Sequence, residues 1–188
     1  MHKQCVVTVL SSALLNNMTY DIMYLMADIV KKYLDNSKQL KILDVGSLDV
    51  HNPLKKLTFG RYLDKSPLWD YTGLDLVAGR NVDVISEEPY NYPFASNSFD
   101  VVVSGSTLEH VFDTHKFIKE LARISKDLVI VIAPNTHPEH KYPVDCWRIF
   151  PDGMNFLLGE IAELMVVDVY RGGGKELSST VGIAKKIH

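Results

Sequence analysis

Residues 41–49 constrain the fold of this chain more than any other part of its sequence. Ile42, Leu43 and Val45 form a short apolar run of the kind found in buried parallel strands. Gly46 then ends the run at a turn where a ligand can approach the backbone, because glycine has no Cβ. In an open α/β sheet, ligands bind at this carboxyl edge of the strands. The stretch therefore predicts a β-strand followed by a ligand-binding turn.

The spacing of apolar residues predicts further strands and helices along the chain. Strands are expected at residues 40–45, 71–76, 81–85, 99–104, 128–133, 164–170 and 179–184. Helices are expected from Asn17 or Thr19 to about Leu34, from Asp113 or Thr114 to about Ile124, and onward from Pro151. Residues 54–63 are expected to form a short helical or irregular connection.

The order of these elements predicts the fold class. The early strands are separated by connections long enough for crossovers, which favour parallel pairing. The last two strands have no helix between them, so an antiparallel hairpin is expected. We predict an α/β fold, namely a three-layer Rossmann-like domain with a seven-stranded, mostly parallel sheet and a C-terminal antiparallel β-hairpin. It forms a single domain over residues 1–188, with a helical segment at 1–36 and an insertion at 135–150.

Composition narrows the location and the partners. The net charge of −3 argues weakly against a nucleic-acid partner held by a basic surface. Cys5 and Cys146 are too isolated for a disulfide framework or a Cys-rich zinc site, and they suit a cytoplasmic location. Residues 5–15 loosely resemble an export signal but lack a cleavage site, and they are too short to cross a membrane. A packed N-terminal segment is the preferred interpretation.

Two acidic residues, Asp44 and Asp75, lie at the carboxyl ends of the first two predicted strands. In a doubly wound sheet Asp75 would lie beside the first turn, where a carboxylate can accept both hydroxyls of a ribose. The alternative is that Asp75 only turns the chain. A dinucleotide site would require G-x-G-x-x-G, of which only Gly46 is present, and Asp49 would repel a phosphate. A ribose-containing cofactor with cationic groups and no phosphate, such as S-adenosylmethionine, fits better.

Five short motifs support the same interpretation. They are Ile-Leu-Asp-Val-Gly-Ser at 42–47, Tyr-Thr-Gly-Leu-Asp-Leu at 71–76, Tyr-Pro-Phe at 92–94, Asn-Ser-Phe-Asp-Val-Val at 97–102 and Leu-Glu-His-Val at 108–111. Together they resemble the class I S-adenosylmethionine-dependent methyltransferases, from about Tyr20 to the end of the chain. The Gly-Ser-Leu-Asp-Val loop is similar to a bacterial-type subgroup often associated with surface-glycan or small-molecule biosynthesis, as are residues 142–148 and 151–153.

The resemblance implies S-adenosylmethionine as the cofactor and gives several residues a role toward its reactive end. Asp44, Gly46 and Ser47 would line the methionine portion. Ser104 would lie close to the sulfonium, with Glu109 just behind it.

The same resemblance implies contacts with the nucleoside. Asp75 would hold the ribose hydroxyls, Leu76 would lie against the adenine, and Asp83 would lie at the edge of the adenine. The family usually carries further glycines in its first loop, where this chain has Leu48 and Val50. A non-catalytic domain that keeps the fold for partner binding is therefore a second hypothesis.

Methyl transfer to an oxygen requires the acceptor to lose a proton, which a histidine can take. His110 and His140 are the candidates for this role, although His110 could instead be a satisfied histidine at the entrance of a helix. The insertion gathers charged and aromatic side chains that would suit a polar small-molecule acceptor such as a sugar or a phenol, namely His137, Tyr142, Asp145, Trp147 and Arg148.

The alternative for this insertion is a lid in which Trp147 packs and Arg148 pairs with Asp145 or Asp152. No metal is predicted, because His137, His140 and Asp145 lack a supporting ligand pattern elsewhere. The leading hypothesis is thus a small-molecule methyltransferase acting on oxygen. A nicotinamide-dependent oxidoreductase is disfavoured by the missing phosphate-binding glycines.

Overall fold

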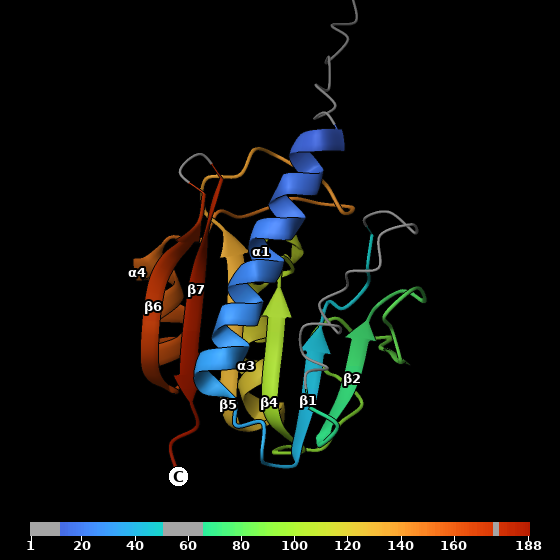
Figure 1. Cartoon of the computed structure of the whole chain (residues 1–188), viewed down its shortest axis with the longest axis vertical. Coiled ribbons are helices and arrows are strands. Elements are labelled where there is room, and N and C mark those ends of the chain that lie inside the picture. Colours follow the sequence, from blue (N-terminus) through green and yellow to red (C-terminus); the bar gives the residue numbers. More distant parts are fainter. Residues whose placement is uncertain (1–11, 51–65, 175–176) are drawn as a thin grey trace, which may run out of the picture.

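The computed structural model describes residues 12–50, 66–174 and 177–188. They contain a seven-stranded sheet of strand order β3-β2-β1-β4-β5-β7-β6 (Figure 1). The strands are β1 (Leu40–Val45), β2 (Trp69–Asp75), β3 (Val84–Ile85), β4 (Phe99–Gly105), β5 (Ser125–Pro134), β6 (Met165–Gly173) and β7 (Ser178–Lys185). Strands β1 to β5 pair in parallel, whereas β7 runs antiparallel to both β5 and β6. The predicted fold class, with its C-terminal hairpin, is confirmed.

Helices cover both faces of this sheet (Figure 1). Helix α1 (Ser12–Tyr33) lies on one face, where Met26 and Ile29 pack with Ile42 and other strand residues. Helix α3 (Thr114–Ile124) lies on the other face together with α4 (Pro151–Phe156), which continues into a π-helical turn (Leu157–Ile161). Leu43 packs on that second face, because neighbouring residues of a strand point to opposite sides. The alternation produces two buried cores and three layers.

Several boundaries differ from those predicted. Helix α1 begins at Ser12, before the predicted caps Asn17 and Thr19. Strand β3 is reduced to two residues because Asn81 has a positive φ of 71° and the carboxylate of Asp83 accepts a hydrogen bond from the amide of Gly73. Both features bend the chain at residues that were predicted to be extended. The predicted connection at 54–63 lies outside the described residues, as does most of the segment 5–15.

Helix α3 begins as predicted. The Asp113 carboxylate accepts a hydrogen bond from the amide of Lys116 at 3.0 Å, which is the geometry of an N-cap. Within the described part of the chain, no helix has the length and apolar character that crossing a membrane requires.

The parallel strands all point their carboxyl ends to one edge of the sheet, at the top in Figure 1. The turn after β1, the ends of β2 and β3, the segment after β4 and the insertion after β5 therefore gather there. This edge carries the residues that the sequence assigned to cofactor and acceptor.

Candidate active site

The turn after β1 accommodates only glycine at its first position. Gly46 has a φ of 78°, and a Cβ built on it would lie 2.0 Å from the Oγ1 of Thr107. The amides of Gly46 and Ser47 both donate hydrogen bonds to the carbonyl of Leu74, at 2.9 and 3.1 Å. The turn is thus held between the end of β2 and the segment that follows β4.

Asp44 lies beneath this turn, 2% exposed, and accepts a hydrogen bond from the Tyr71 hydroxyl at 2.8 Å. The Asn81 amide donates to the same hydroxyl at 2.8 Å and to the carbonyl of Ser47 at 3.0 Å. Burial raises the pKa of Asp44 to about 7; the Tyr71 hydrogen bond acts in the opposite direction, and the charge of Asp75 adds to the rise. Asp44 is therefore a carboxyl group whose charge can respond to a cationic ligand near neutral pH.

The Asp75 carboxylate joins the first two loops of this edge. Its Oδ2 accepts from the amide of Leu48 at 3.0 Å, and its Oδ1 accepts from the amides of Leu76 and Val77 at 2.7 and 3.4 Å. Carboxylate oxygens have about four lone-pair sites in total, so capacity is left for hydroxyl donors. The side chains of Leu76, Val77 and Ile85 are 50%, 58% and 53% exposed, an apolar surface at the ends of β2 and β3 that a flat ring can cover.

The other residues assigned to the cofactor, Ser47, Asp83 and Ser104, differ in their contacts. The Ser47 hydroxyl is buried and has no hydrogen-bond partner in residues 12–50, 66–174 and 177–188. Asp83 holds β2 through the amide of Gly73, as described above. Ser104 is fully buried, and its hydroxyl donates to the carbonyl of Val45 at 2.9 Å. The Ser104 side chain thus bridges β4 to β1 and is not directed out of the sheet edge.

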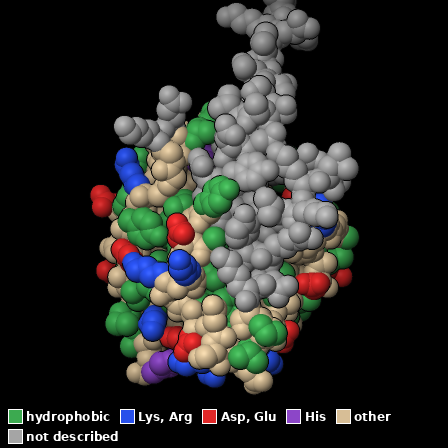
Figure 2. All heavy atoms as spheres, viewed as in Figure 1, with side chains coloured by type: hydrophobic (Ala, Val, Ile, Leu, Met, Phe, Trp, Pro, Cys, Tyr) green, Lys and Arg blue, Asp and Glu red, His purple; other side chains and the backbone are tan. Residues whose placement is uncertain are grey.

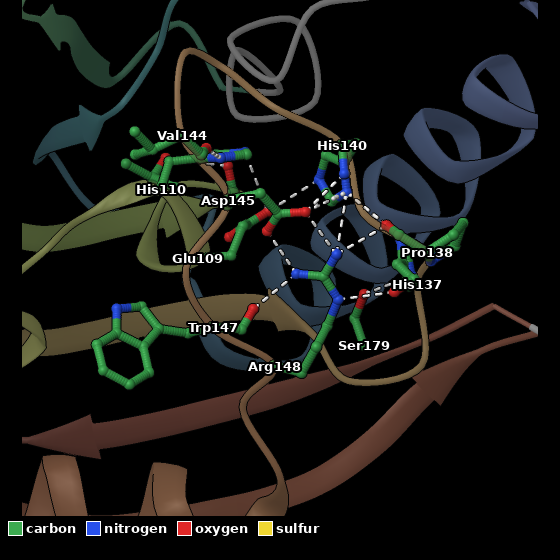
Figure 3. Close-up of polar contacts among 12 residues, drawn as sticks. Glu109, His110, His137, Pro138, His140, Val144, Asp145, Trp147, Arg148 and Ser179 are labelled. Atoms are coloured by element: carbon green, nitrogen blue, oxygen red, sulfur yellow. Dashed lines mark hydrogen bonds and ion pairs between the residues drawn. The ribbon is translucent and has the colours of Figure 1, made fainter. Parts of the chain in front are cut away.

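Glu109 lies in a short 3-10 helix (Leu108–His110) after β4, and its side chain is fully buried. Its Oε1 lies 3.6 Å from the Nε2 of His110 and 3.6 Å from the Nε2 of His140 (Figure 3). Within the described part of the chain, neither carboxylate oxygen has a hydrogen-bond partner. The structure thus brings together the two predicted catalytic histidines around a buried carboxylate, although His140 comes from the distant insertion.

The opposite nitrogens of these two histidines face backbone carbonyls. The Nδ1 of His110 lies 2.6 Å from the carbonyl oxygen of Val144, and the Nδ1 of His140 lies 3.0 Å from that of Pro138. A carbonyl oxygen can only accept a hydrogen bond, which favours a proton on each Nδ1. The Nδ1 of His140 also lies 3.4 Å from the Nη2 of Arg148, a longer contact than that to the Pro138 carbonyl. Burial acts to lower the pKa of His140, but Glu109, the Pro138 carbonyl and Asp145 outweigh it and raise this pKa.

Arg148 fixes the conformation of the insertion. Its guanidinium donates to both carboxylate oxygens of Asp145, from Nη1 at 2.6 Å and from Nη2 at 2.7 Å. It also donates to three backbone carbonyls, those of His137, Pro138 and Trp147, each at 2.7 Å (Figure 3). The pairing of Arg148 with Asp145, predicted as one of two alternatives, is confirmed. Burial acts to raise the pKa of Asp145, but the bonds from Arg148 and the His140 amide hold it below its usual range.

The remaining residues assigned to the acceptor divide into two groups. His137 is 5% exposed, with its Nε2 3.3 Å from the Ser179 hydroxyl. Burial, together with the positive charges of His140 and Arg148, lowers the pKa of His137 to about 4. By contrast, Tyr142 and Trp147 are each 43% exposed. These two aromatic side chains therefore contribute to the surface of the insertion, whereas His137 belongs to its buried part.

Sequence reasoning had given no role to three residues that shape this edge. Tyr71 and Asn81 support Asp44, and Thr107 closes the space above Gly46. Tyr71 was recognised only as part of a strand motif. Asn81 was predicted as the first residue of a strand, two positions after Gly79, and that pattern did not indicate its contacts with Tyr71 and Ser47.

Residues 59–133 match the family model described as a methyltransferase domain. No sequence among curated proteins matches the chain.

Solved structures with a similar fold cover nearly the whole chain. A methyltransferase from Aquifex aeolicus, described as SAM dependent, is 18% identical, with a TM-score of 0.64 over 95% of this chain and 100% of that one. The 1,6-didemethyltoxoflavin-N1-methyltransferase of Burkholderia thailandensis, solved with its substrate and S-adenosylhomocysteine, is 16% identical, with a TM-score of 0.69 and coverage of 95% and 84%. The Haloferax volcanii complex of the Trm112 activator and a methyltransferase gives 15% identity, a TM-score of 0.64 and coverage of 94% and 95%.

Proposed function

We propose that this chain, an S-adenosylmethionine-dependent methyltransferase with the class I fold, transfers the methyl group to an oxygen of a small polar acceptor such as a sugar. The supporting observation is the placement of two chemically different groups at one sheet edge. The Gly46 turn and Asp75 form the cofactor side, and Glu109 with its two histidines forms the acceptor side. Thr107 joins them, because it closes over Gly46 and precedes Glu109 by two residues.

The residues of the cofactor side fit S-adenosylmethionine. The unpartnered hydroxyl of Ser47 offers a donor and an acceptor to the methionine portion. Asp44 can carry a negative charge near the cationic amino and sulfonium groups. Asp75 offers acceptor capacity to the ribose, and the exposed side chains of Leu76 and Ile85 offer an apolar surface to the adenine.

Bound S-adenosylmethionine supplies an activated methyl group on a sulfonium, whose C–S bond breaks with its electron pair going to sulfur. The protein has to hold the acceptor oxygen in line with that bond and promote loss of its proton. We assign the promotion of this proton loss to the group of Glu109, His110 and His140. Tyr142 and Trp147 supply exposed aromatic surface against which the acceptor can lie.

Calorimetry with S-adenosylmethionine and S-adenosylhomocysteine tests the cofactor assignment, and saturable binding of both is expected. Absence of heat from either ligand at about 1 mM would contradict it, since this concentration detects free energies of binding near −4 kcal/mol. Radiolabelled methyl transfer to a panel of sugars and phenols then tests the acceptor class.

Asp75→Ala should weaken the binding of S-adenosylhomocysteine by about 1–3 kcal/mol, or about 5- to 150-fold, because a charge-assisted contact with the ribose is lost. Calorimetry measures the change. The loss should disappear when the ligand is the analogue without both ribose hydroxyls, since that analogue cannot use the carboxylate.

The control for this prediction is Asp100→Ala. Asp100 also accepts a backbone amide, that of Lys41 at 2.9 Å, but it lies at the amino end of β4 and so at the opposite sheet edge. Its removal should leave cofactor affinity unchanged. If Asp75→Ala weakens both ligands equally, Asp75 acts only by anchoring the Leu48 loop, and the ribose assignment is wrong.

Asp44→Asn should reduce the pH dependence of stability. An unfolded aspartate releases its proton near pH 4, whereas burial keeps the Asp44 proton up to about pH 7. The folded state therefore binds more protons in this interval, and stability falls as the pH rises through it. From about pH 5 to about pH 8, the free energy of unfolding of the parent should therefore fall by roughly 2–3 kcal/mol more than that of the asparagine variant.

Urea unfolding of both proteins at the two pH values measures this difference. Asp100→Asn corrects for the general loss of one negative charge. An equal pH dependence in the parent and in Asp44→Asn would show that Asp44 titrates normally in the folded protein.

The proposed partner is a small molecule rather than a nucleic acid. On the face shown in Figure 2, the visible Lys and Arg side chains are interspersed with Asp and Glu side chains and form no broad basic patch. The Cys146 thiol is free and exposed, which suits a reducing compartment, so we place the reaction in the cytoplasm.

A further inference from the structure

We propose that Glu109, His110 and His140 bind one divalent first-row metal cation, and that the cation holds the acceptor oxygen at an open coordination position. The first part stands on the geometry of these three residues alone. The second part rests on the proposed methyl transfer to oxygen.

The three side chains converge closely enough to share a cation. Each offers one ligand atom, and these atoms all lie within 4.8 Å of one another. The Oε1 of Glu109 is 3.6 Å from each imidazole Nε2. Zinc lies about 2.0–2.2 Å from nitrogen and carboxylate ligands, so two ligand atoms of a tetrahedral site are roughly 3.3–3.6 Å apart. The two distances from Glu109 match this spacing, so the group needs little movement to enclose an ion.

The orientation of the two histidine rings also supports a metal site. The Nδ1 of His110 contacts the carbonyl of Val144 and that of His140 contacts the carbonyl of Pro138, and the Nε2 atom of each ring faces Glu109. Metal-binding histidines characteristically donate their second ring N–H to a carbonyl or a carboxylate in this way, which fixes the tautomer and the ring. The backbone carbonyls thus present both Nε2 atoms in the form that binds a metal.

The carboxylate of Glu109 is fully buried. Among the residues that the structure describes, neither of its oxygens accepts a hydrogen bond. Burying a carboxylate without hydrogen-bond donors is costly. A bound cation would offset this cost and would also engage the Nε2 atoms of both histidines. The nearby Asp145 is not available for this task, because Arg148 binds both of its oxygens.

Two parts of the chain that are distant in sequence are fixed around this group. The amide of Cys146 donates to the carbonyl of Glu109 at 2.7 Å, and the indole of Trp147 donates to the carbonyl of Val111 at 2.7 Å. These bonds hold the insertion against the segment after β4, so His140 is brought to Glu109 by the fold itself. The set differs from the combination of His137, His140 and Asp145 considered from the sequence, since His137 faces Ser179.

Two imidazoles and one carboxylate are a ligand set for zinc, iron, cobalt or a similar ion. Three protein ligands leave at least one position open, as in catalytic rather than structural sites. A hydroxyl group bound there would release its proton to solvent more readily, because the cation stabilises the resulting oxygen anion. That oxygen would then form a bond to the methyl carbon as the C–S bond breaks. The electron pair of the C–S bond stays on sulfur. The acceptor class implied is an alcohol or a phenol.

The test titrates Co²⁺ into the full chain after treatment with a chelator, and follows the visible d–d absorption. One Co²⁺ per chain should bind, and Zn²⁺ should displace it. Addition of azide, a small anionic ligand, should change the Co²⁺ spectrum because a coordination position is open. Glu109→Gln and His140→Ala should each weaken Co²⁺ binding by at least about 100-fold, more than is typical for changes that only orient a ligand.

His115→Ala is the matched control, because His115 is exposed on α3 and outside the group; its Co²⁺ affinity should equal that of the parent. Circular dichroism verifies that each variant is folded, and the isosteric Glu109→Gln guards against loss of folding in His140→Ala. The metal site is overturned if the parent binds no Co²⁺ or Zn²⁺ at about 100 µM, or if both variants keep the affinity of the parent. An azide-insensitive spectrum would overturn the open position.

Binding of S-adenosylhomocysteine is measured in the same chelator-treated samples. Cofactor binding without metal binding overturns this inference and leaves the proposed function standing. Metal binding without cofactor binding supports the site and contradicts the methyltransferase function.

Discussion

Arg148→Ala should lower the free energy of unfolding by about 3–5 kcal/mol at neutral pH, the range measured when one partner of a buried ion pair is removed. The Asp145 side chain is 1% exposed, so its charge would be left buried without its main partner. Three backbone carbonyls of the insertion would each lose one donor as well. Urea unfolding, followed by circular dichroism, measures the loss.

Lys32→Ala provides the comparison for an exposed ion pair. Lys32 lies 3.4 Å from Asp168, and the two side chains are 62% and 36% exposed. Such pairs contribute about 0–1 kcal/mol. The double variant Arg148→Met with Asp145→Asn should recover part of the lost stability, because no unpaired charge remains. If Arg148→Ala costs no more than Lys32→Ala, the insertion is not held by this pair.

Gly46→Ala should destabilise the protein by more than about 2 kcal/mol and reduce cofactor affinity by at least about 10-fold. Its backbone conformation alone costs a residue with a side chain roughly 1–2 kcal/mol. The new Cβ would also lie 2.0 Å from the Oγ1 and 2.7 Å from the Cβ of Thr107. Since Thr107 packs against the turn, either the turn or the segment that leads to Glu109 has to move. Thermal unfolding and calorimetry with S-adenosylhomocysteine measure the two effects.

Gly159→Ala separates this effect from the general cost of replacing a glycine. A Cβ at Gly159 would meet only the Val166 Cγ2, at 3.5 Å, which is an ordinary van der Waals contact. This variant should remain within about 1 kcal/mol of the parent and bind the cofactor normally. An alanine at position 46 that leaves both quantities unchanged would show that the turn relaxes without strain.

The sequence predicts the sheet well where local pattern and burial agree. The strand at 40–45 was predicted with its observed bounds, because an apolar run between polar segments marks a buried parallel strand. The start of α3 was predicted because Asp113 has the chemistry of an N-cap. The length of strand β3 was overestimated, since the residues before it bend and the Asp83 side chain bonds the amide of Gly73 in β2, a contact that local sequence does not indicate.

Some contacts of the candidate site could likewise be predicted from the sequence, and others could not. Asp44, Gly46 and Asp75 could be expected to meet, because the ends of neighbouring parallel strands share one edge. The meeting of Glu109 with His140 could not, because the insertion lacks regular structure and no periodicity indicates where its side chains point. Its conformation is set by tertiary bonds, chiefly those of Arg148, that join residues of the insertion to one another.

The three backbone amides that bind Asp75 have an entropic consequence for the nucleoside. An unrestrained aspartate in a loop would lose rotamer freedom when it binds a ligand. Such ordering costs roughly 0.5–1.5 kcal/mol for a long side chain, and no more than that for the short side chain of aspartate. Here the amides of Leu48, Leu76 and Val77 have already fixed the carboxylate. The ordering was completed when the chain folded, so the ribose meets an acceptor that is immobile before the ligand arrives. Adenosine alone should therefore retain a measurable share of the affinity of the whole cofactor.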